Sequence, residues 1–139
     1  NDSILIDKAI QNVCMDLKDF YTITNRQSPD ANTLQVQLQL NSNHKIFKGH
    51  FPDHPVLPGV AMLQIIKELS ASHFKKSLFM KAAQRVKFIN LVAPQQQNTL
   101  VFNLAFQQDK DLLKVKNSTT FVDETPVMNC TITYQIQSK

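Results

Sequence analysis

Several residue types are scarce in this chain. Its 139 residues include two glycines, two tyrosines and no tryptophan, and only Arg26 and Arg85 of the 15 basic residues are arginine. Because base reading and base stacking depend on arginine and aromatic side chains, this composition argues against nucleic-acid binding.

No apolar run approaches the ~18 residues of a membrane-spanning helix, which argues against a membrane protein. The two cysteines, Cys14 and Cys130, form neither a disulfide framework nor a zinc-ligand spacing, so we expect a reducing compartment, the cytoplasm.

What is present is typical of a globular domain. The chain is 42% apolar and 19% charged, with a formal net charge of +4. Its length is that of one domain, which we expect to span residues 1–139. The mild basic excess would attract an acidic partner.

Hydrophobic periodicity predicts two helices and six strands. Apolar residues recur at helical spacing in 4–17, and 60–74 is apolar on more than one side, as in a buried helix. Residues 33–40 alternate leucine or valine with glutamine, the pattern of a strand with one wet face. The other predicted strands are 20–24, 83–93, 99–107, 113–121 and 128–136. Short connections between the later strands favour antiparallel neighbours, so we expect an α+β fold whose sheet is filled by one helix.

One segment concentrates the unusual residues. Both glycines, three of the six prolines and three of the four histidines lie within residues 44–59. This stretch therefore holds both residues with a permissive backbone, half of those with a fixed φ, and most of the groups that titrate near neutrality. Such a concentration indicates a built site directly before the 60–74 helix.

Residues 47–60 read Phe-Lys-Gly-His-Phe-Pro-Asp-His-Pro-Val-Leu-Pro-Gly-Val. This resembles the motif of the β-hydroxyacyl-acyl-carrier-protein dehydratases, which have the hot-dog fold, an antiparallel sheet wrapped around a buried central helix. Val86 to Phe88, followed by Pro94, is similar to the family's strand after that helix. The family's usual Asp-Gly turn near the end is replaced by Asp123-Glu124-Thr125.

The resemblance implies an activity and its partners. It implies dehydration of 3-hydroxyacyl thioesters to trans-2-enoyl thioesters, an acyl carrier protein as partner, and neither a cofactor nor a metal. It also implies a homodimer or a higher even oligomer, with the active site at the subunit interface.

This chemistry needs a base for the α-proton, a donor for the leaving hydroxyl and stabilisation of charge on the thioester oxygen. His50 is interpreted as the base. The backbone N–H of Gly59, at the positive end of the helix, would contact the thioester oxygen. Further residues expected to contact the substrate are Phe51, Val60, Leu63 and Phe88, with Met62 as another candidate. The simpler interpretation of Met62, Leu63 and Phe88 is that they belong to the hydrophobic core.

The chain differs from the family at the acidic residue on the central helix. The family's Glu or Asp, five positions after the glycine of the Pro-Gly pair, corresponds here to Gln64, which can orient a hydroxyl but cannot deliver a proton. One turn later, where the family often has glutamine, stands Glu68. Residues i and i+4 share a helix face, so we expect the Glu68 carboxylate to lean toward the Gln64 amide. The alternative is a solvent-facing charge at Glu68.

Other functions stay open at this point. The missing acid motivates a noncatalytic hot-dog subunit that binds acyl thioesters or supports an active partner. A hot-dog thioesterase would instead need a carboxylate that activates water. His44, His50, Asp53 and His54 are alternative metal ligands, although Pro52 and Pro55 prevent helical ligand spacing. The lysines that could meet an acidic carrier, or form a solvated face, are Lys45, Lys48, Lys75, Lys76, Lys81 and Lys87.

Overall fold

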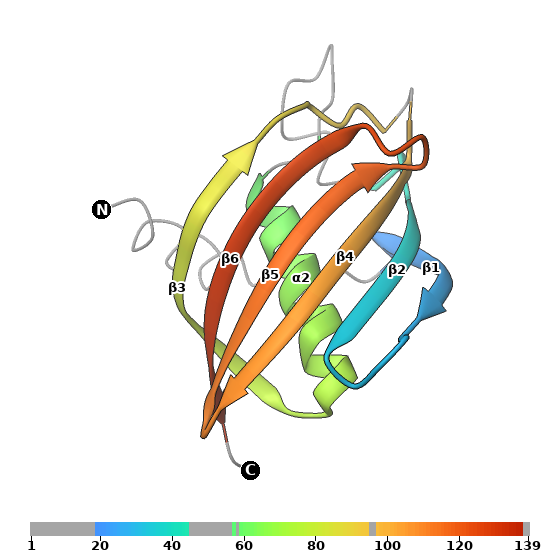
Figure 1. Cartoon of the computed structure of the whole chain (residues 1–139). Coiled ribbons are helices and arrows are strands. Elements are labelled where there is room, and N and C mark those ends of the chain that lie inside the picture. The colour runs from blue at the N-terminus through green and yellow to red at the C-terminus, as the bar shows by residue number, and fades with distance from the viewer. Residues whose placement is uncertain (1–18, 45–56, 58, 95–96, 138–139) are drawn as a thin grey trace.

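The computed structural model describes residues 19–44, 57, 59–94 and 97–137. Within these ranges an antiparallel sheet curls around a single helix (Figure 1). The elements, in chain order, are β1 (Tyr21–Gln27), β2 (Thr33–Leu40), α2 (Gly59–Phe74), β3 (Ser77–Phe88), β4 (Thr99–Asp109), β5 (Leu112–Phe121) and β6 (Pro126–Gln137). No helix of the described ranges is both long and apolar enough to cross a membrane.

The strand order is β1-β2-β4-β5-β6-β3, and every neighbouring pair is antiparallel. Lys110 and Glu124, with φ of 58° and 72°, form the tight turns that join β4 to β5 and β5 to β6. Lys75, with φ of 55°, ends α2 in the left-handed conformation that commonly closes helices. The chain then crosses to the far side of the sheet, so β1 and β3 are its two edges.

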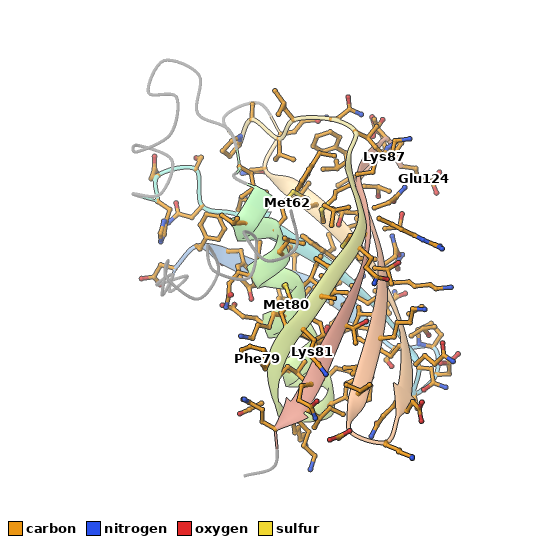
Figure 2. All side chains as sticks on the ribbon, turned by 90° about the vertical axis from the view of Figure 1, so that its left-hand side faces the viewer. Met62, Phe79, Met80, Lys81, Lys87 and Glu124 are labelled. Carbon is orange, nitrogen blue, oxygen red and sulfur yellow. The ribbon has the colours of Figure 1, made fainter. Side chains whose placement is uncertain are left out.

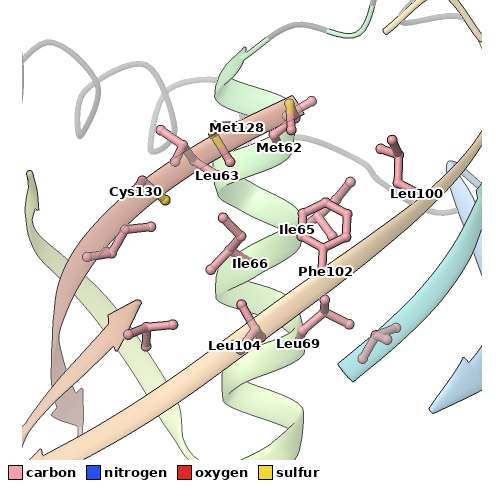
Figure 3. Packing of buried hydrophobic residues seen from close by; sticks show 14 of the residues in the cluster. Met62, Leu63, Ile65, Ile66, Leu69, Leu100, Phe102, Leu104, Met128 and Cys130 are labelled. Carbon is pink, nitrogen blue, oxygen red and sulfur yellow. The ribbon is translucent and has the colours of Figure 1, made fainter. Parts of the chain in front are cut away.

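The core lies between α2 and the sheet. The helix turns apolar side chains toward the strands, and Figure 3 shows Leu63 and Ile66 near Met128 and Cys130 of β6. The buried residues of α2 are Ala61, Met62, Leu63, Ile65, Ile66, Leu69 and Ser70. The opposite side of the helix is only partly buried. We call it the open stripe of α2, and it consists of Val60, Gln64, Lys67, Glu68 and Ala71.

The α+β prediction of a sheet wrapped around one helix is confirmed. The strand predicted at 33–40 coincides with β2, and those at 99–107, 113–121 and 128–136 lie within β4, β5 and β6. The helix predicted at 60–74 is α2 with one residue added at its start. The helix predicted at 4–17 lies outside the described residues.

The position predicted for the strand at 83–93 is wrong. The corresponding strand, β3, begins at Ser77 and ends at Phe88, before Pro94. Its length is set by β6, because the ladder runs from Ser77↔Gln137 to Phe88↔Met128. Beyond it the N–H groups of Ile89 and Asn90 both donate to the Val127 carbonyl. β3 therefore ends where its regular pairing with β6 becomes irregular, well before Pro94.

Candidate functional site

The start of α2 lies against the end of β3. The Leu57 N–H donates to the Val92 carbonyl at 2.8 Å and ties the segment before the helix to the segment after the strand. A Cβ on Gly59 would lie 2.6 Å from Cζ of Phe88. Only glycine therefore allows the Phe88 ring to rest in this position against the helix start. The ring is 52% exposed, so the simpler interpretation of Phe88 as a core residue is wrong.

Gln64 and Glu68 form a hydrogen-bonded pair on the open stripe. Gln64 Nε2 donates to Glu68 Oε2 at 3.3 Å, which confirms the expected lean of the carboxylate toward the amide. The other carboxylate oxygen, Oε1, accepts a 2.7 Å hydrogen bond from the hydroxyl of Tyr21. Glu68 is thus partly buried and held on both oxygens, rather than a freely solvated charge.

Tyr21 is the site neighbour that sequence reasoning missed. It is the first residue of β1, pairs with Leu40 of β2, and packs edge-on against Phe20 with ring centroids 6.4 Å apart. Burial, and then the hydrogen bond to Glu68 and its charge, raise the pKa of Tyr21 well above the usual value. Its hydroxyl therefore stays protonated near neutral pH and remains a donor. Nothing in the local pattern could link it to Glu68, which lies 47 positions further along the chain.

The hydrogen bonds of Glu68 leave one acceptor of this pair open to a ligand. Both carboxylate oxygens of Glu68 accept hydrogen bonds, one from the Tyr21 hydroxyl and one from the Gln64 amide. Because Nε2 of Gln64 is engaged, its carbonyl oxygen Oε1 is turned away from Glu68. Gln64 follows Gly59 by about 7.5 Å along the helix axis, and its side chain leans back toward the helix start. A hydroxyl could therefore be held near Gln64 while a carbonyl lies at Gly59.

The remaining predicted residues are placed differently. His50 and Phe51 lie outside the described residues, as do Asp53 and His54. Val60 is partly buried at the start of the open stripe. Leu63 is only 1% exposed and packs in the core, so a contact with an acyl chain stays a prediction for this residue.

Among the residues that the structure describes, buried side chains occupy the interface between α2 and the sheet. Met62 and Leu63, at 2% and 1% exposure, offer almost no surface within this chain (Figure 3). A hollow of about 850 Å³ lies instead along the sheet strands, lined by residues such as Gln35, Asn103 and Asn129. No residue of α2 lines this hollow, so it is separate from the candidate site.

The metal alternative finds no support among the residues that the structure describes. No three His, Cys, Asp or Glu side chains gather there as a metal site would require. Of its four suggested ligands only His44 is described, and its ring packs edge-on against Phe20 with centroids 5.0 Å apart.

Known proteins resemble this chain in sequence and in fold. The family model for ApeI-like proteins, described as ApeI dehydratase, matches residues 25–125. The 3-hydroxyacyl-[acyl-carrier-protein] dehydratase FabZ of Fusobacterium nucleatum is 28% identical over 112 residues, which cover 77% of this chain and 78% of that protein.

Two solved structures illustrate the shared fold. The dehydratase heterocomplex ApeI:P from Xenorhabdus doucetiae matches with a TM-score of 0.69 and 24% identity, over 82% of this chain and 96% of that one. A hypothetical thioesterase with coenzyme A from Streptococcus pneumoniae matches with a TM-score of 0.63 and 9% identity, over 95% and 97% of the two chains. The sheet curled around α2, the match over residues 25–125 and these likenesses agree, and the chain belongs to the ApeI-like dehydratase family, with the hot-dog fold.

Proposed function

We propose that this protein dehydrates 3-hydroxyacyl thioesters carried on acyl carrier protein to trans-2-enoyl thioesters. The observation that carries the proposal is the hydrogen-bonded pair of Gln64 and Glu68 on the open stripe of α2. In a member of a dehydratase family, this pair offers an amide and a carboxylate where the chemistry needs a group for the leaving hydroxyl.

The proposed reaction has three parts. His50 takes the α-proton from C2 of the acyl group, and the electron pair forms the C2–C3 double bond as the C3–O bond breaks. The hydroxyl receives a proton and leaves as water. Negative charge that develops on the thioester oxygen is stabilised by the Gly59 N–H at the positive end of α2.

We propose that Gln64 and Glu68 together bind and protonate the leaving hydroxyl. Gln64 would orient the hydroxyl, and Glu68, whose carboxylate accepts a hydrogen bond from this amide, would replace the family's acid. For this role Glu68 must enter the cycle protonated and recover its proton after water has left. Phe51, Val60, Leu63 and Phe88 are proposed to contact the acyl chain or the thioester.

One observation favours a second candidate function. Both carboxylate oxygens of Glu68 are engaged as acceptors, by Tyr21 and by Gln64, so neither is free to face a leaving hydroxyl. A chain with this pair could bind acyl thioesters without turnover and support an active partner subunit. The similar structure from Xenorhabdus doucetiae is the dehydratase heterocomplex ApeI:P.

We also propose that β3 is the contact between two subunits, either two copies of this chain or this chain and a related one. As a sheet edge, β3 offers unpaired backbone groups, which a second strand can pair. Apolar side chains are exposed along this edge and just beyond it, and Figure 2 shows Phe79 on β3. They are Phe79, Phe88, Ile89 and Leu91. If two copies of this chain pair, sedimentation of the purified chain should show a dimer, and Phe79→Lys should shift it to the monomer; a chain that pairs with a related one should sediment as a monomer when alone.

An acidic acyl carrier protein is the proposed macromolecular partner. The lysines predicted for this contact that the structure describes, Lys75, Lys76, Lys81 and Lys87, are all exposed. Because exposed charges attract over a distance set by salt, binding of the carrier should weaken as ionic strength rises.

The test is a single set of assays on the full chain with a 3-hydroxyacyl carrier protein. Formation of the conjugated enoyl thioester indicates a dehydratase, release of free thiol indicates a thioesterase, and saturable binding without either indicates the noncatalytic subunit. For the dehydratase, His50→Ala should lower kcat by about 10²–10⁴-fold while the protein stays folded. His73→Ala is the matched control, because His73 stacks on Phe106 at the other end of α2 and should retain turnover. Full activity in His50→Ala would exclude His50 as the base.

A further inference from the structure

We propose that Tyr21 is a positioning residue that acts through Glu68 on Gln64 and makes the site selective for acyl groups that carry a hydroxyl. The inference rests on the proposed function to the extent that it takes the open stripe of α2 as the acyl-binding face. It does not require that the bound ligand be turned over.

The first step concerns the orientation of the Gln64 amide. A glutamine side chain has donors on its nitrogen and an acceptor on its oxygen, and the two ends differ in what they can bind. In this chain the nitrogen end is directed to Glu68 Oε2 at 3.3 Å. The oxygen end has no hydrogen-bond partner among the residues that the structure describes, so it is the end left to accept from a ligand hydroxyl.

The second step concerns what holds Glu68. A glutamate side chain on a partly exposed helix face has several rotamers, and an i, i+4 amide contact alone stabilises one of them only weakly. The 2.7 Å bond from Tyr21 is the shorter of the two contacts and comes from another element, β1. Anchored at Oε1, the carboxylate presents Oε2 to Gln64 in one orientation. Tyr21 therefore controls the amide without touching it.

The chain's second tyrosine provides a contrast. Tyr134 is fully buried in the core, and its hydroxyl has no hydrogen-bond partner in the described part of the chain. Tyr21 lies on an edge strand whose other residues are exposed, and its hydroxyl bridges two elements. Both tyrosines offer the same substitution to phenylalanine, which removes one oxygen and leaves the ring. The Tyr134 variant is thus a matched control for the Tyr21 variant.

The third step is the consequence for ligand choice. A site with an oriented acceptor favours a ligand that donates to it, because an analogue without the hydroxyl leaves the acceptor unpaired. At a partly exposed position we expect a preference of about tenfold for the hydroxylated ligand. When the orientation is lost, the amide can turn its nitrogen outward or move, and the preference should fall.

The experiment is a titration with two pantetheine thioesters, 2,2-difluoro-3-hydroxyoctanoyl and 2,2-difluorooctanoyl. Neither has an α-proton, so neither can be dehydrated, and they differ only in the hydroxyl. The wild type should bind the hydroxylated ligand about tenfold more tightly. Tyr21→Phe should reduce this preference to about twofold or less and leave the affinity for the other ligand unchanged. Tyr134→Phe should retain the full preference.

A merely structural role for Tyr21 would give a different result. If the Tyr21–Glu68 hydrogen bond only holds β1 against α2, its loss would weaken the binding of both ligands equally and preserve the ratio of their affinities. A preserved ratio in Tyr21→Phe, together with dehydration of the natural substrate by the wild type, would overturn only this inference. Absence of binding and of turnover in the wild type would overturn the proposed function and the inference together. A lost ratio in a protein without turnover would support the inference and favour the noncatalytic candidate.

Discussion

The two sides of α2 differ in composition and in burial. The side that packs on the sheet is apolar except for Ser70, and all of its residues are buried. The open stripe contains Gln64, Lys67 and Glu68 between two small apolar residues, and all of them are partly exposed. Because burial of apolar surface supplies most of the folding free energy, one side stabilises the fold while the other can change its polar residues at little cost. An exchanged acid and amide on this stripe are therefore compatible with an intact hot-dog fold.

The largest effect on stability should come from the packed side. Ile66→Ala removes a side chain with 0% exposure and should lower the free energy of unfolding by about 2–5 kcal/mol. Turnover per folded molecule should stay near that of the wild type. Urea denaturation with a parallel activity assay measures both quantities. Lys67→Ala, one position along on the open stripe, is the control and should change stability by less than about 0.5 kcal/mol. Equal losses for the two variants would contradict the division of the helix into two sides.

The next effect concerns chemistry on the open stripe. If Glu68 delivers the proton, Glu68→Gln should lower turnover by about 10²-fold while the free energy of unfolding changes by less than about 1 kcal/mol. Gln64→Glu should be less damaging, although two carboxylates one turn apart repel each other. Steady-state kinetics of both variants decide the matter. If Glu68→Gln leaves turnover unchanged while Gln64→Glu greatly increases it, Glu68 does not replace the family's acid, and the noncatalytic candidate is favoured.

A smaller effect is expected where the helix start meets β3. Gly59→Ala places a Cβ 2.6 Å from Cζ of Phe88, whose half-exposed ring can swing outward. Because the ring can move, stability should change little. The affinity for an acyl thioester should nevertheless fall by roughly tenfold, because the methyl group and the displaced ring crowd the helix start.

A double-mutant cycle that combines Gly59→Ala with Phe88→Ala tests whether the ring causes this loss of affinity. In the double variant the alanine at position 59 no longer meets the ring, so the two changes should be non-additive in affinity. Calorimetric titration of the four proteins gives the coupling directly. Additive losses would show that the ring does not act through the contact with Gly59.

The smallest effect is expected at Cys130, which faces the packed side of α2 (Figure 3). Burial raises the pKa of the Cys130 thiol to about 12, although a hydrogen bond with Asn117 lowers it slightly. The raised value means that the folded state holds the neutral thiol, which is unreactive at pH 8. In a Cys14→Ala protein, iodoacetamide should therefore label Cys130 only after unfolding in urea. Rapid labelling of the native protein would show that the packed side of the helix opens.

The alternation of apolar and polar residues predicts a strand correctly where that alternation is uninterrupted. β2 was predictable because glutamines on its outer face alternate with four buried apolar residues. β3 was misplaced because its alternation is broken at two points, between Met80 and Ala82 and between Gln84 and Lys87. Arg85 adopts a φ of 55° at the second of these irregularities. A bulge shifts the side chains of a strand to the other face, so a period of two cannot be followed through it.

The α+β class, the motif at 47–60, the family resemblance and the contact between Gln64 and Glu68 could all be predicted from residue order. These depend on neighbours in the chain or on the regular spacing within one helix, which residue order specifies. The contact of Phe88 with Gly59 and the hydrogen bond from Tyr21 to Glu68 arise only when the chain is folded. Both contacts join distant elements, and they require the strand order that places β1 and β3 at opposite edges of the sheet. That order results from the packing of the whole sheet around α2, which no local pattern contains.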